Sequence, residues 1–302
     1  MFARVWEKPM AAAPKISVII PHYNDVRGLA ICLDKLADQT VAKDAFEIIV
    51  ADNDSPQGEE AIRQLIGGRA TLVVVRERGA GPARNGGAAV ARGEIFAFID
   101  SDCQAEPQWL AEGVAALAAS DFVGGRVKVL VDDPSRMTPS EAFESVFTFD
   151  IEDYVTRKGF AGSGNLFCPR RVFETVGGFR TRVSEDVDWS HRATQAGYRL
   201  AYAPRAAVGH PARRTWRELV AKWRRVNAET YALLERRRAA RLRWLLRTLA
   251  MPASALVHTP KVLASDRLNS FRQRLDGLAI LYRLRLWRFT DSLRLLAADP
   301  AR

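Results

Sequence analysis

Two aspartates separated by one residue, Asp100 and Asp102, follow directly after the apolar run 95–99. A short apolar run bounded by polar residues is typical of a strand that is covered on both faces. Open α/β sheets bind ligands beyond the carboxyl ends of their strands. Carboxylates there suit a hard cation, Mg2+ or Mn2+, which commonly completes its shell with substrate phosphates. The pair therefore indicates a nucleotide diphosphate site, although an isolated D-x-D pattern is more often a solvated loop or a helix cap.

The elements before this pair alternate between strands and helices. Short runs rich in β-branched residues occur at 16–20, 46–51 and 71–75, and residues with helical spacing or helix-forming composition separate them. This alternation predicts a mostly parallel sheet with right-handed crossovers.

The pattern after Asp102 is mixed. Helices are predicted at 107–118 and 140–155, strands at 122–131, 165–168 and 198–203, and further helices before Gly177 and after Ser184. A flexible loop, Gly162-Ser163-Gly164, precedes the strand at 165–168.

Three other polar motifs fall at the same predicted edge of the sheet as Asp100 and Asp102. Pro21-His22-Tyr23-Asn24 follows the first strand and Asp52-Asn53-Asp54-Ser55 follows the second. Ala83-Arg84-Asn85-Gly86 is expected to begin the helix after the third strand, where backbone N–H groups favour an anion. Because parallel strands end at one edge, these motifs predict a single cleft.

With Ser184-Glu185-Asp186, these motifs make residues 16–210 resemble the family 2 glycosyltransferases. The resemblance implies the GT-A fold, an α/β Rossmann-like fold with a mostly parallel sheet and flanking helices, followed here by a C-terminal basic helical extension. It implies a nucleotide-diphosphate sugar as donor and Mg2+ or Mn2+ as cofactor. The domain boundaries expected are a tail at 1–14, the GT-A domain at 15–212 and an arginine-rich amphipathic helical region at 213–302.

The resemblance also implies roles for individual residues in donor binding. Pro21 and Tyr23 would line the base pocket, and Asp52 would accept a hydrogen bond from the nucleobase. Asp100 would lie near the ribose and the metal, and Asp102 would be the direct metal ligand, with His210 as a further ligand of the metal or diphosphate. The full set of donor residues is Pro21, Tyr23, Asn24, Asp52, Arg84, Asp100, Ser101 and Asp102. Asn53 and Asp54 depart from the family's usual Asp-Asp-Gly-Ser pattern, so the role of Asp54 stays open.

On the acceptor side, the resemblance makes Asp186 the general base, which takes the proton of the acceptor hydroxyl as that hydroxyl attacks the anomeric carbon with inversion. From spacing alone, acidic residues after Ser184 would more simply complement a helix dipole. Acceptor contacts are expected from Glu185, Gly164, Asn165 and Trp189, against the alternatives of a turn for the glycine and of core packing for the tryptophan.

Positive charge is concentrated in the last third of the chain. Residues 205–302 hold 22 Arg or Lys against 7 Asp or Glu, whereas residues 1–204 hold 23 against 28. Near the end, apolar residues recur in steps of three or four and predict an amphipathic helix with a cationic face: Leu268, Phe271, Leu275, Leu278, Tyr282, Leu286, Phe289, Leu293 and Leu296. This stripe could face an anionic membrane surface, or pack on the catalytic body or on a second subunit of a homo-oligomer.

Other features bound the location and the function class. The three cysteines show no C-x-x-C spacing, and no run is long and apolar enough to span a membrane. We expect no export signal at residues 1–10, because Glu7, Lys8 and Pro9 stand where a signal peptide needs an apolar core. We therefore expect a cytoplasmic protein, alternatively peripheral on the inner face of the cell membrane.

The function expected is transfer of a single sugar to a hydroxyl of a glycan or a lipid-linked acceptor. Two alternatives stay open: a non-catalytic polyanion- or membrane-binding protein, and a sugar-phosphate nucleotidyltransferase. Nucleic acid is not expected as a partner, because aromatic residues are not interleaved with the basic ones as stacking platforms.

Overall fold

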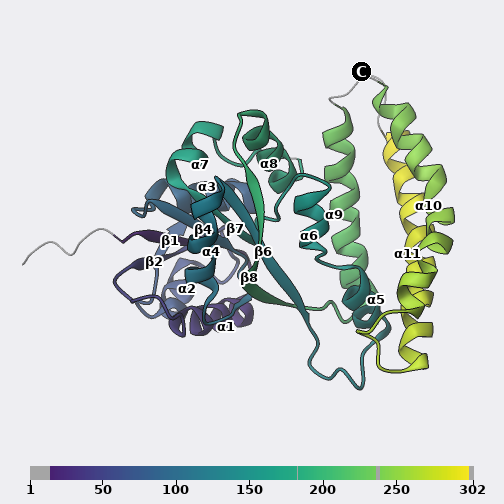
Figure 1. Cartoon of the computed structure of the whole chain (residues 1–302), viewed down its shortest axis with the longest axis horizontal. Helices are drawn as coiled ribbons and strands as arrows, with labels where there is room; N and C mark the ends of the chain where they lie inside the picture. Colours follow the sequence, from purple (N-terminus) through teal and green to yellow (C-terminus); the bar gives the residue numbers. More distant parts are fainter. Residues whose placement is uncertain (1–13, 182, 236–238, 299–302) are drawn as a thin grey trace, which may run out of the picture.

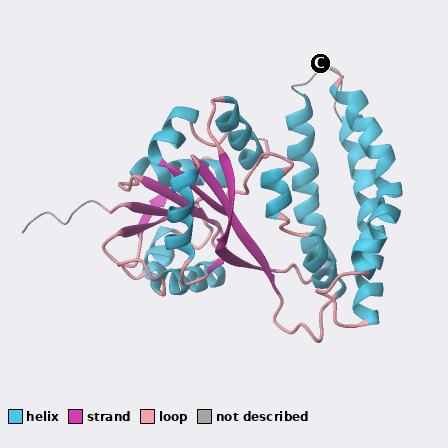
Figure 2. Cartoon of the chain, viewed as in Figure 1, coloured by secondary structure: helices cyan, strands magenta, loops and turns pink. Residues whose placement is uncertain are grey.

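The computed structural model describes residues 14–181, 183–235 and 239–298, so the predicted tail at 1–14 lies outside the described residues except for Pro14. These residues form a mixed α/β body and a bundle of long C-terminal helices beside it (Figure 1, Figure 2). The mostly parallel sheet with flanking helices and the helical C-terminal region confirm the predicted fold class.

The body contains one eight-stranded sheet with the order β3-β2-β1-β4-β7-β6-β8-β5. Strands β1, β2, β3 and β4 run parallel, β7 is antiparallel to β4 and β6, and β8 is parallel to β6. Six strands therefore share one direction and end at the same edge. The bounds are β1 Ile16–His22, β2 Phe46–Asp52, β3 Thr71–Val74, β4 Ile95–Ile99, β5 Gln104–Ala105, β6 Phe122–Leu130, β7 Asn165–Pro169 and β8 Leu200–Pro211.

Helices cover both faces of the sheet because successive strand residues point to opposite sides. Ile20 packs in one cluster with helices α1, α2 and α4, and Ile19 packs in another with α3, α6, α7 and α8. These helices are α1 Val26–Ala37, α2 Glu59–Ile66, α3 Ala80–Val90, α4 Trp109–Ala116, α6 Ile151–Thr156, α7 Arg170–Val176 and α8 Glu185–Gln195, and a short 3-10 helix at Leu117–Ala119 follows α4.

The helix predicted at 140–155 is two helices. Helix α5, Pro139–Phe147, begins with a capping box in which Thr138 and Glu141 satisfy each other's backbone N–H groups. The chain then turns at Phe149, whose φ of 59° cannot continue a helix. The prediction of a single helix was wrong because the apolar residues at 140–155 keep a helical spacing across this turn. The turn directs α6 back onto the sheet.

Three long helices follow the sheet: α9 Trp216–Glu235, α10 Ala240–Leu263 and α11 Phe271–Ala298. They pack on α5 through a third apolar cluster that includes Phe143, Leu219, Val262 and Leu281. Within the described residues, none of the helices combines the length and the apolar character that crossing a membrane requires.

The face of α11 that packs inward differs from the predicted stripe. Residues such as Gly277, Leu281 and Leu284 are buried, and so is Arg288, whereas Phe271 and Leu286 are 69% and 57% exposed. Leucines occur on more than one side of this helix, so periodicity alone could not decide which side meets the bundle.

Candidate active site

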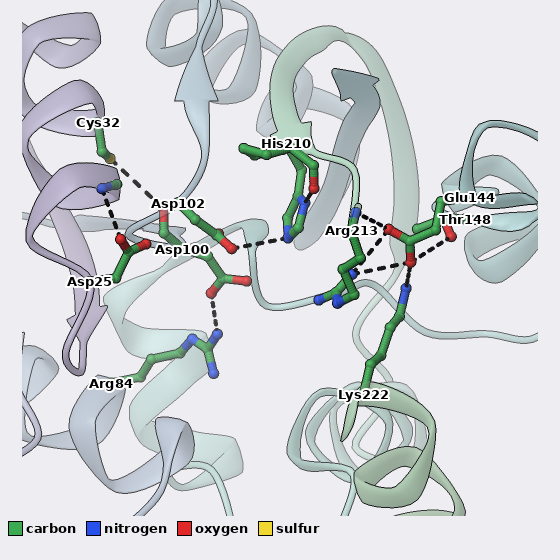
Figure 3. A network of polar contacts seen from close by, with 12 residues as sticks. Asp25, Cys32, Arg84, Asp100, Asp102, Glu144, Thr148, His210, Arg213 and Lys222 are labelled. Atoms are coloured by element: carbon green, nitrogen blue, oxygen red, sulfur yellow. Dashed lines mark hydrogen bonds and ion pairs between the residues drawn. The ribbon is translucent and has the colours of Figure 1, made fainter. Parts of the chain in front are cut away.

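Asp102 and His210 meet because of a short strand pairing. Strand β5 pairs antiparallel with β8, with Gln104 opposite Gly209, which brings the end of the β4 loop against the end of β8. The Nε2 atom of His210 lies 3.3 Å from Oδ2 of Asp102 (Figure 3). The Nδ1 atom of His210 lies 2.7 Å from the carbonyl oxygen of Pro211, so it donates there and Nε2 is the ring nitrogen that faces Asp102.

Arg84 links two acidic parts of the site. Its guanidinium donates to Asp100 at 2.5 Å and to Glu185 at 3.1 Å, and the side chain is almost fully buried. Burial would lower the pKa of Arg84, but the two carboxylates outweigh it and raise that pKa. Helix α3 begins at Ala80 rather than at residue 83, so Arg84 reaches the site from one turn inside the helix. It thereby joins the end of β4 to the first turn of α8.

Asp186 stands in the first turn of α8. Its Oδ1 accepts from the Val187 backbone N–H at 2.8 Å and from the Ser184 hydroxyl at 3.1 Å. Burial, reinforced by the neighbouring Glu185, raises the pKa of Asp186 above the usual carboxyl value. A carboxylate with a raised pKa is a better proton acceptor, which suits a general base.

The loop at 162–164 lies against both carboxylates. A Cβ atom on Gly164 would stand 2.5 Å from Oδ2 of Asp100, whereas one on Gly162 would meet nothing nearer than Oδ2 of Asp186 at 3.9 Å. The close approach of the loop to Asp100 therefore requires glycine at position 164.

These groups line one cavity of about 1020 Å³, which has a second wall that the sequence did not reveal. Helix α9 supplies Lys222 and Glu229, and the segment before it supplies Arg213. Burial raises the pKa of Glu229 to about 7, with Glu185 and Asp186 adding to the effect. The spacing of seven residues between Lys222 and Glu229 on one helical face was the available signal, but it resembles a solvated polar face.

A buried ion cluster fixes this second wall. Glu144 of α5 accepts from Lys222 at 2.8 Å and from the Arg213 backbone N–H at 2.8 Å (Figure 3). Burial would raise the pKa of Glu144, but Lys222 and Arg213 outweigh it and lower that pKa. Burial also lowers the pKa of Lys222, to about 8. Glu144 therefore joins α5 to α9 and to the segment before α9.

The predicted nucleotide end of the cavity is lined by Pro21 and by Tyr23, which is 49% exposed. Asp52 is buried beneath them: its carboxylate is bonded to His22 Nδ1 at 2.7 Å and to the Ser55 hydroxyl at 2.6 Å. Asn24 has a φ of 54° and its backbone N–H donates to Ser55. Asp52 and Asn24 thus shape the loop rather than face the cavity, which differs from the expected direct contact with the nucleobase.

Two motif asparagines hold loops. Asn53 donates to the carbonyls of Val75 and Glu77 and accepts from the Gly79 N–H, which explains the amide at this position. Asn85 makes a matching pair of hydrogen bonds with the backbone of Phe179 and so holds the segment before α8.

Two expected acceptor contacts do not fit their surroundings. Trp189 is fully buried among aromatic residues and donates to the Gly177 carbonyl at 3.0 Å, so it belongs to the core. Asn165 lines the cavity, but it is only 2% exposed and its amide is used by Trp109 Nε1 and by the carbonyls of Arg126 and Ala206. The remaining predicted residues, Arg84, Asp100, Ser101, Asp102, Gly164, Glu185, Asp186 and His210, all line the cavity.

The donor set fits a divalent cation that takes further ligands from its substrate. No group of three His, Cys, Asp or Glu side chains is arranged to hold a metal within the described ranges. Asp102 and His210 nevertheless place a carboxylate oxygen and a ring nitrogen side by side, and both are atom types that can ligate a divalent cation. Burial raises the pKa of Asp102, and Asp100 adds to this while His210 opposes it. Mg2+ is usually held by one or two carboxylates together with phosphates, so the chemistry of Asp102 and His210 is compatible with a cation that takes its other ligands from a substrate.

Comparison with known proteins identifies the family. The sequence model of the family described as "Glycosyl transferase family 2" matches residues 17–180 of this chain. The chain belongs to glycosyl transferase family 2. The chain is similar to glycosyltransferase AglE of Haloferax volcanii, with 36% identity over 208 residues, which cover 66% of this chain and 68% of AglE. The protein is accordingly a glycosyltransferase, as the motifs predicted.

Solved structures show the same fold. The family 2 chain is similar to the mannosyltransferase PcManGT from Pyrobaculum calidifontis in complex with GDP-Man and Mn2+, with a TM-score of 0.50 and 22% identity over 95% of this chain and 75% of that one. It is also similar to GalNAc-T7 with UDP, GalNAc and Mn2+, with a TM-score of 0.52 and 18% identity over 67% of this chain and 44% of that one. These likenesses show the GT-A fold.

Proposed function

We propose that this protein is an inverting, metal-dependent glycosyltransferase that moves a single sugar from a nucleotide-diphosphate sugar to a hydroxyl of a glycan or lipid-linked acceptor. The observation that carries the proposal is that Asp186, with its raised pKa, lines the same cavity as the Asp102–His210 pair. A proton acceptor and a diphosphate site within one cavity are the two requirements of such a transfer. The complexes of PcManGT and GalNAc-T7 with nucleotides and Mn2+ support this choice of donor and cofactor.

Each residue of the site has a part in the reaction. Asp102 and His210, with Asp100, would hold Mg2+ or Mn2+, which when bound offsets the negative charge of the departing diphosphate. Arg84 keeps Asp100 and Glu185 in place through its two ion pairs. Asp186 takes the proton from the acceptor hydroxyl, with Glu185 next to the acceptor. No covalent intermediate on the enzyme is needed.

The domain boundaries are part of the proposal. Residues 15–212 would form the nucleotide-sugar-binding catalytic domain and 213–302 the helical extension. Because Lys222 and Glu229 of the extension line the cavity, the extension would complete the acceptor side of the site rather than serve only as an appendage. No observation favours the nucleotidyltransferase or the non-catalytic alternative.

The test is the Asp186→Asn variant, assayed with a panel of nucleotide sugars and acceptors. The variant should bind the donor with unchanged affinity, since Asp186 is assigned to the acceptor, and should lose transfer by at least about 100-fold. An unchanged transfer rate would refute the role of Asp186 as base.

A further inference from the structure

Helices α10 and α11 form the outer layer of the molecule, on the side of α9 that faces away from the sheet (Figure 1). Their inner sides are fixed to the rest of the protein by buried residues such as Met251, Val262 and Leu284. Trp244 donates from Nε1 to the Ser292 carbonyl and so ties the two helices together. Helices α10 and α11, which we call the hairpin, are therefore held in place on their inner sides, and their outer sides are free to contact a partner.

The outer side of α10 carries a continuous apolar stripe. Its leucines recur in steps of three, four and seven residues, which places them along one side of a helix. They are largely exposed, with Leu256 at 66%. The stripe consists of Leu242, Leu246, Leu249, Leu256 and Leu263.

Helix α11 carries a matching stripe with steps of four and seven residues, made of Phe271, Leu275, Tyr282, Leu286 and Leu293. The Tyr282 hydroxyl lies 3.0 Å from the Thr259 hydroxyl of α10, so this stripe faces outward next to the neighbouring helix. In both helices the buried residues fall on the opposite side. The two stripes therefore form one apolar surface, which we call the outer face.

Basic residues border the outer face along both long edges. Arg243 lies on the edge of α10 that is away from α11. Lys261 lies on the same side of the helix but is turned toward the body, where its Nζ is 3.6 Å from Oδ2 of Asp150. On the far edge of α11, Arg272, Arg283 and Arg294 recur at intervals of eleven residues, about three helical turns. The Arg283 guanidinium lies over the Trp216 ring of α9, 4.1 Å from its centroid, so Arg272 and Arg294 are the residues of this row that border the outer face. The side chains of Arg272 and Arg294 are 92% and 64% exposed. Residues 240–298 hold eleven Arg or Lys and three Asp or Glu, a net charge of +8.

We propose that the outer face binds in the plane of an anionic lipid bilayer, with the leucines and Phe271 in the acyl boundary and the basic edges on the headgroups. An apolar stripe flanked by Arg and Lys is the pattern of interfacial helices. A second copy of the chain is the competing occupant, but face-to-face pairing would bring two surfaces of the same positive sign together. Charge thus favours anionic lipid over self-association.

This binding goes beyond sugar transfer and does not depend on the proposed reaction. It has one consequence for the reaction, however. Arg247 of α10 lines the catalytic cavity. Docking of the outer face would hold the helical wall of the cavity close to the bilayer, within reach of a lipid-linked acceptor.

The test is flotation of the full chain with vesicles of phosphatidylcholine alone and of phosphatidylcholine mixed with phosphatidylglycerol. The wild type should float with the anionic vesicles and less as salt is raised, because the headgroup attraction is screened. Leu249→Ser with Leu286→Ser should reduce partitioning by about tenfold or more, since two apolar side chains are lost from the interface. Arg243→Gln with Arg272→Gln should reduce it by about fivefold for each charge removed.

Val90→Ser is the matched control, because Val90 is 44% exposed on the catalytic body, away from the hairpin. It should float like the wild type. Thermal unfolding and size-exclusion chromatography with light scattering accompany each variant. Wild type that fails to float, or a leucine variant that is folded and floats unchanged, overturns the proposal. If the wild type is a dimer that does not bind vesicles, and the leucine substitutions convert it to a monomer, the membrane proposal is overturned and the outer face is instead a contact between two copies of the chain.

Discussion

His210 on β8 faces Asp102 in the loop after β4 across 3.3 Å, and the other ring nitrogen of His210 is bonded to the Pro211 carbonyl. A histidine that ligates a metal almost always donates its second N–H to a carboxylate, a carbonyl or water, because that bond fixes the tautomer and the ring orientation. In the proposed site, the bond to the Pro211 carbonyl would hold Nε2 in the orientation that a cation beside Asp102 requires.

The first prediction concerns this contact. His210→Ala should raise the Mn2+ concentration needed for half-maximal transfer by about tenfold or more, because one ligand of the cation is lost. His191→Ala is the control, since His191 lies on α8 and its ring contacts the Lys158 carbonyl rather than the cavity. Mn2+ titration of the transfer rate measures both variants. A His210→Ala enzyme with the wild-type Mn2+ requirement would remove His210 from the metal site.

The second prediction uses the two glycines of the 162–164 loop. Gly164→Ala should lower kcat/KM by about 100-fold, since the added methyl group would push the loop or the Asp100 carboxylate away from its position. Gly162→Ala, whose methyl group has space, should stay close to the wild type. Steady-state kinetics and thermal unfolding of both variants provide the comparison. Equal losses in the two would mean that the loop tolerates no side chain anywhere and that Asp100 is not the reason.

The third prediction concerns the buried Glu144. Replacing it with Gln leaves Lys222 and Arg213 without their carboxylate, which should lower the free energy of unfolding by about 3–5 kcal/mol. Because the pKa of Glu144 is lowered in the folded state, its stabilising effect is present at neutral pH and is lost as the pH falls through that lowered pKa. Denaturant unfolding at several pH values checks this. Glu59→Gln, which removes an exposed pair with Arg63, should cost less than about 1 kcal/mol.

The fourth prediction concerns pH. The pKa of Asp186 is raised, so the transfer rate should increase with pH along an acid limb whose midpoint lies above the ordinary carboxyl value of 3.8. The raised pKa of Asp186 also affects folding stability, which it lowers as the pH rises, whereas it makes the transfer rate increase with pH. Its contribution to stability is full below the unfolded pKa and is lost as the pH rises through the folded pKa. Asp186→Asn should therefore flatten the pH dependence of Tm in that window.

Asp44→Asn is the control for this pH experiment, because Asp44 is exposed in the loop between α1 and β2. Its rate profile and its melting curve should follow the wild type. A wild-type acid limb at or below the ordinary carboxyl value would contradict the assignment of Asp186 as base.

The strands and the cleft could be predicted because their signals are local. The runs at 16–20, 46–51 and 95–99 are short and apolar, and each is followed by its polar motif, so the edge of the sheet could be located from the order of the motifs alone. The structure places β1, β2 and β4 at these runs. The buried Asp52 could not be foreseen, since its partners His22 and Ser55 lie in two different motifs.

The helical wall could not be predicted because it depends on packing between distant segments. Glu144 is isolated in the sequence from Lys222 and Arg213, and only the folded chain brings them together. Helix α11 has apolar residues on two sides. The exposed stripe could be recognised as apolar from the sequence, but the sequence did not decide whether a membrane, the catalytic body or a second subunit contacts it. The expected acceptor contact of Trp189 does not fit its burial, because sequence alone does not distinguish a tryptophan in the core from one that faces an acceptor.

The most direct test of the central claim is equilibrium binding of GDP and UDP to the wild type and to Asp102→Asn, each with Mn2+ and with a chelator. The account predicts that Mn2+ tightens binding of at least one nucleotide to the wild type by about tenfold or more, and that Asp102→Asn abolishes this gain. Nucleotide binding that is equally tight with the chelator, or a gain that survives in Asp102→Asn, would contradict it.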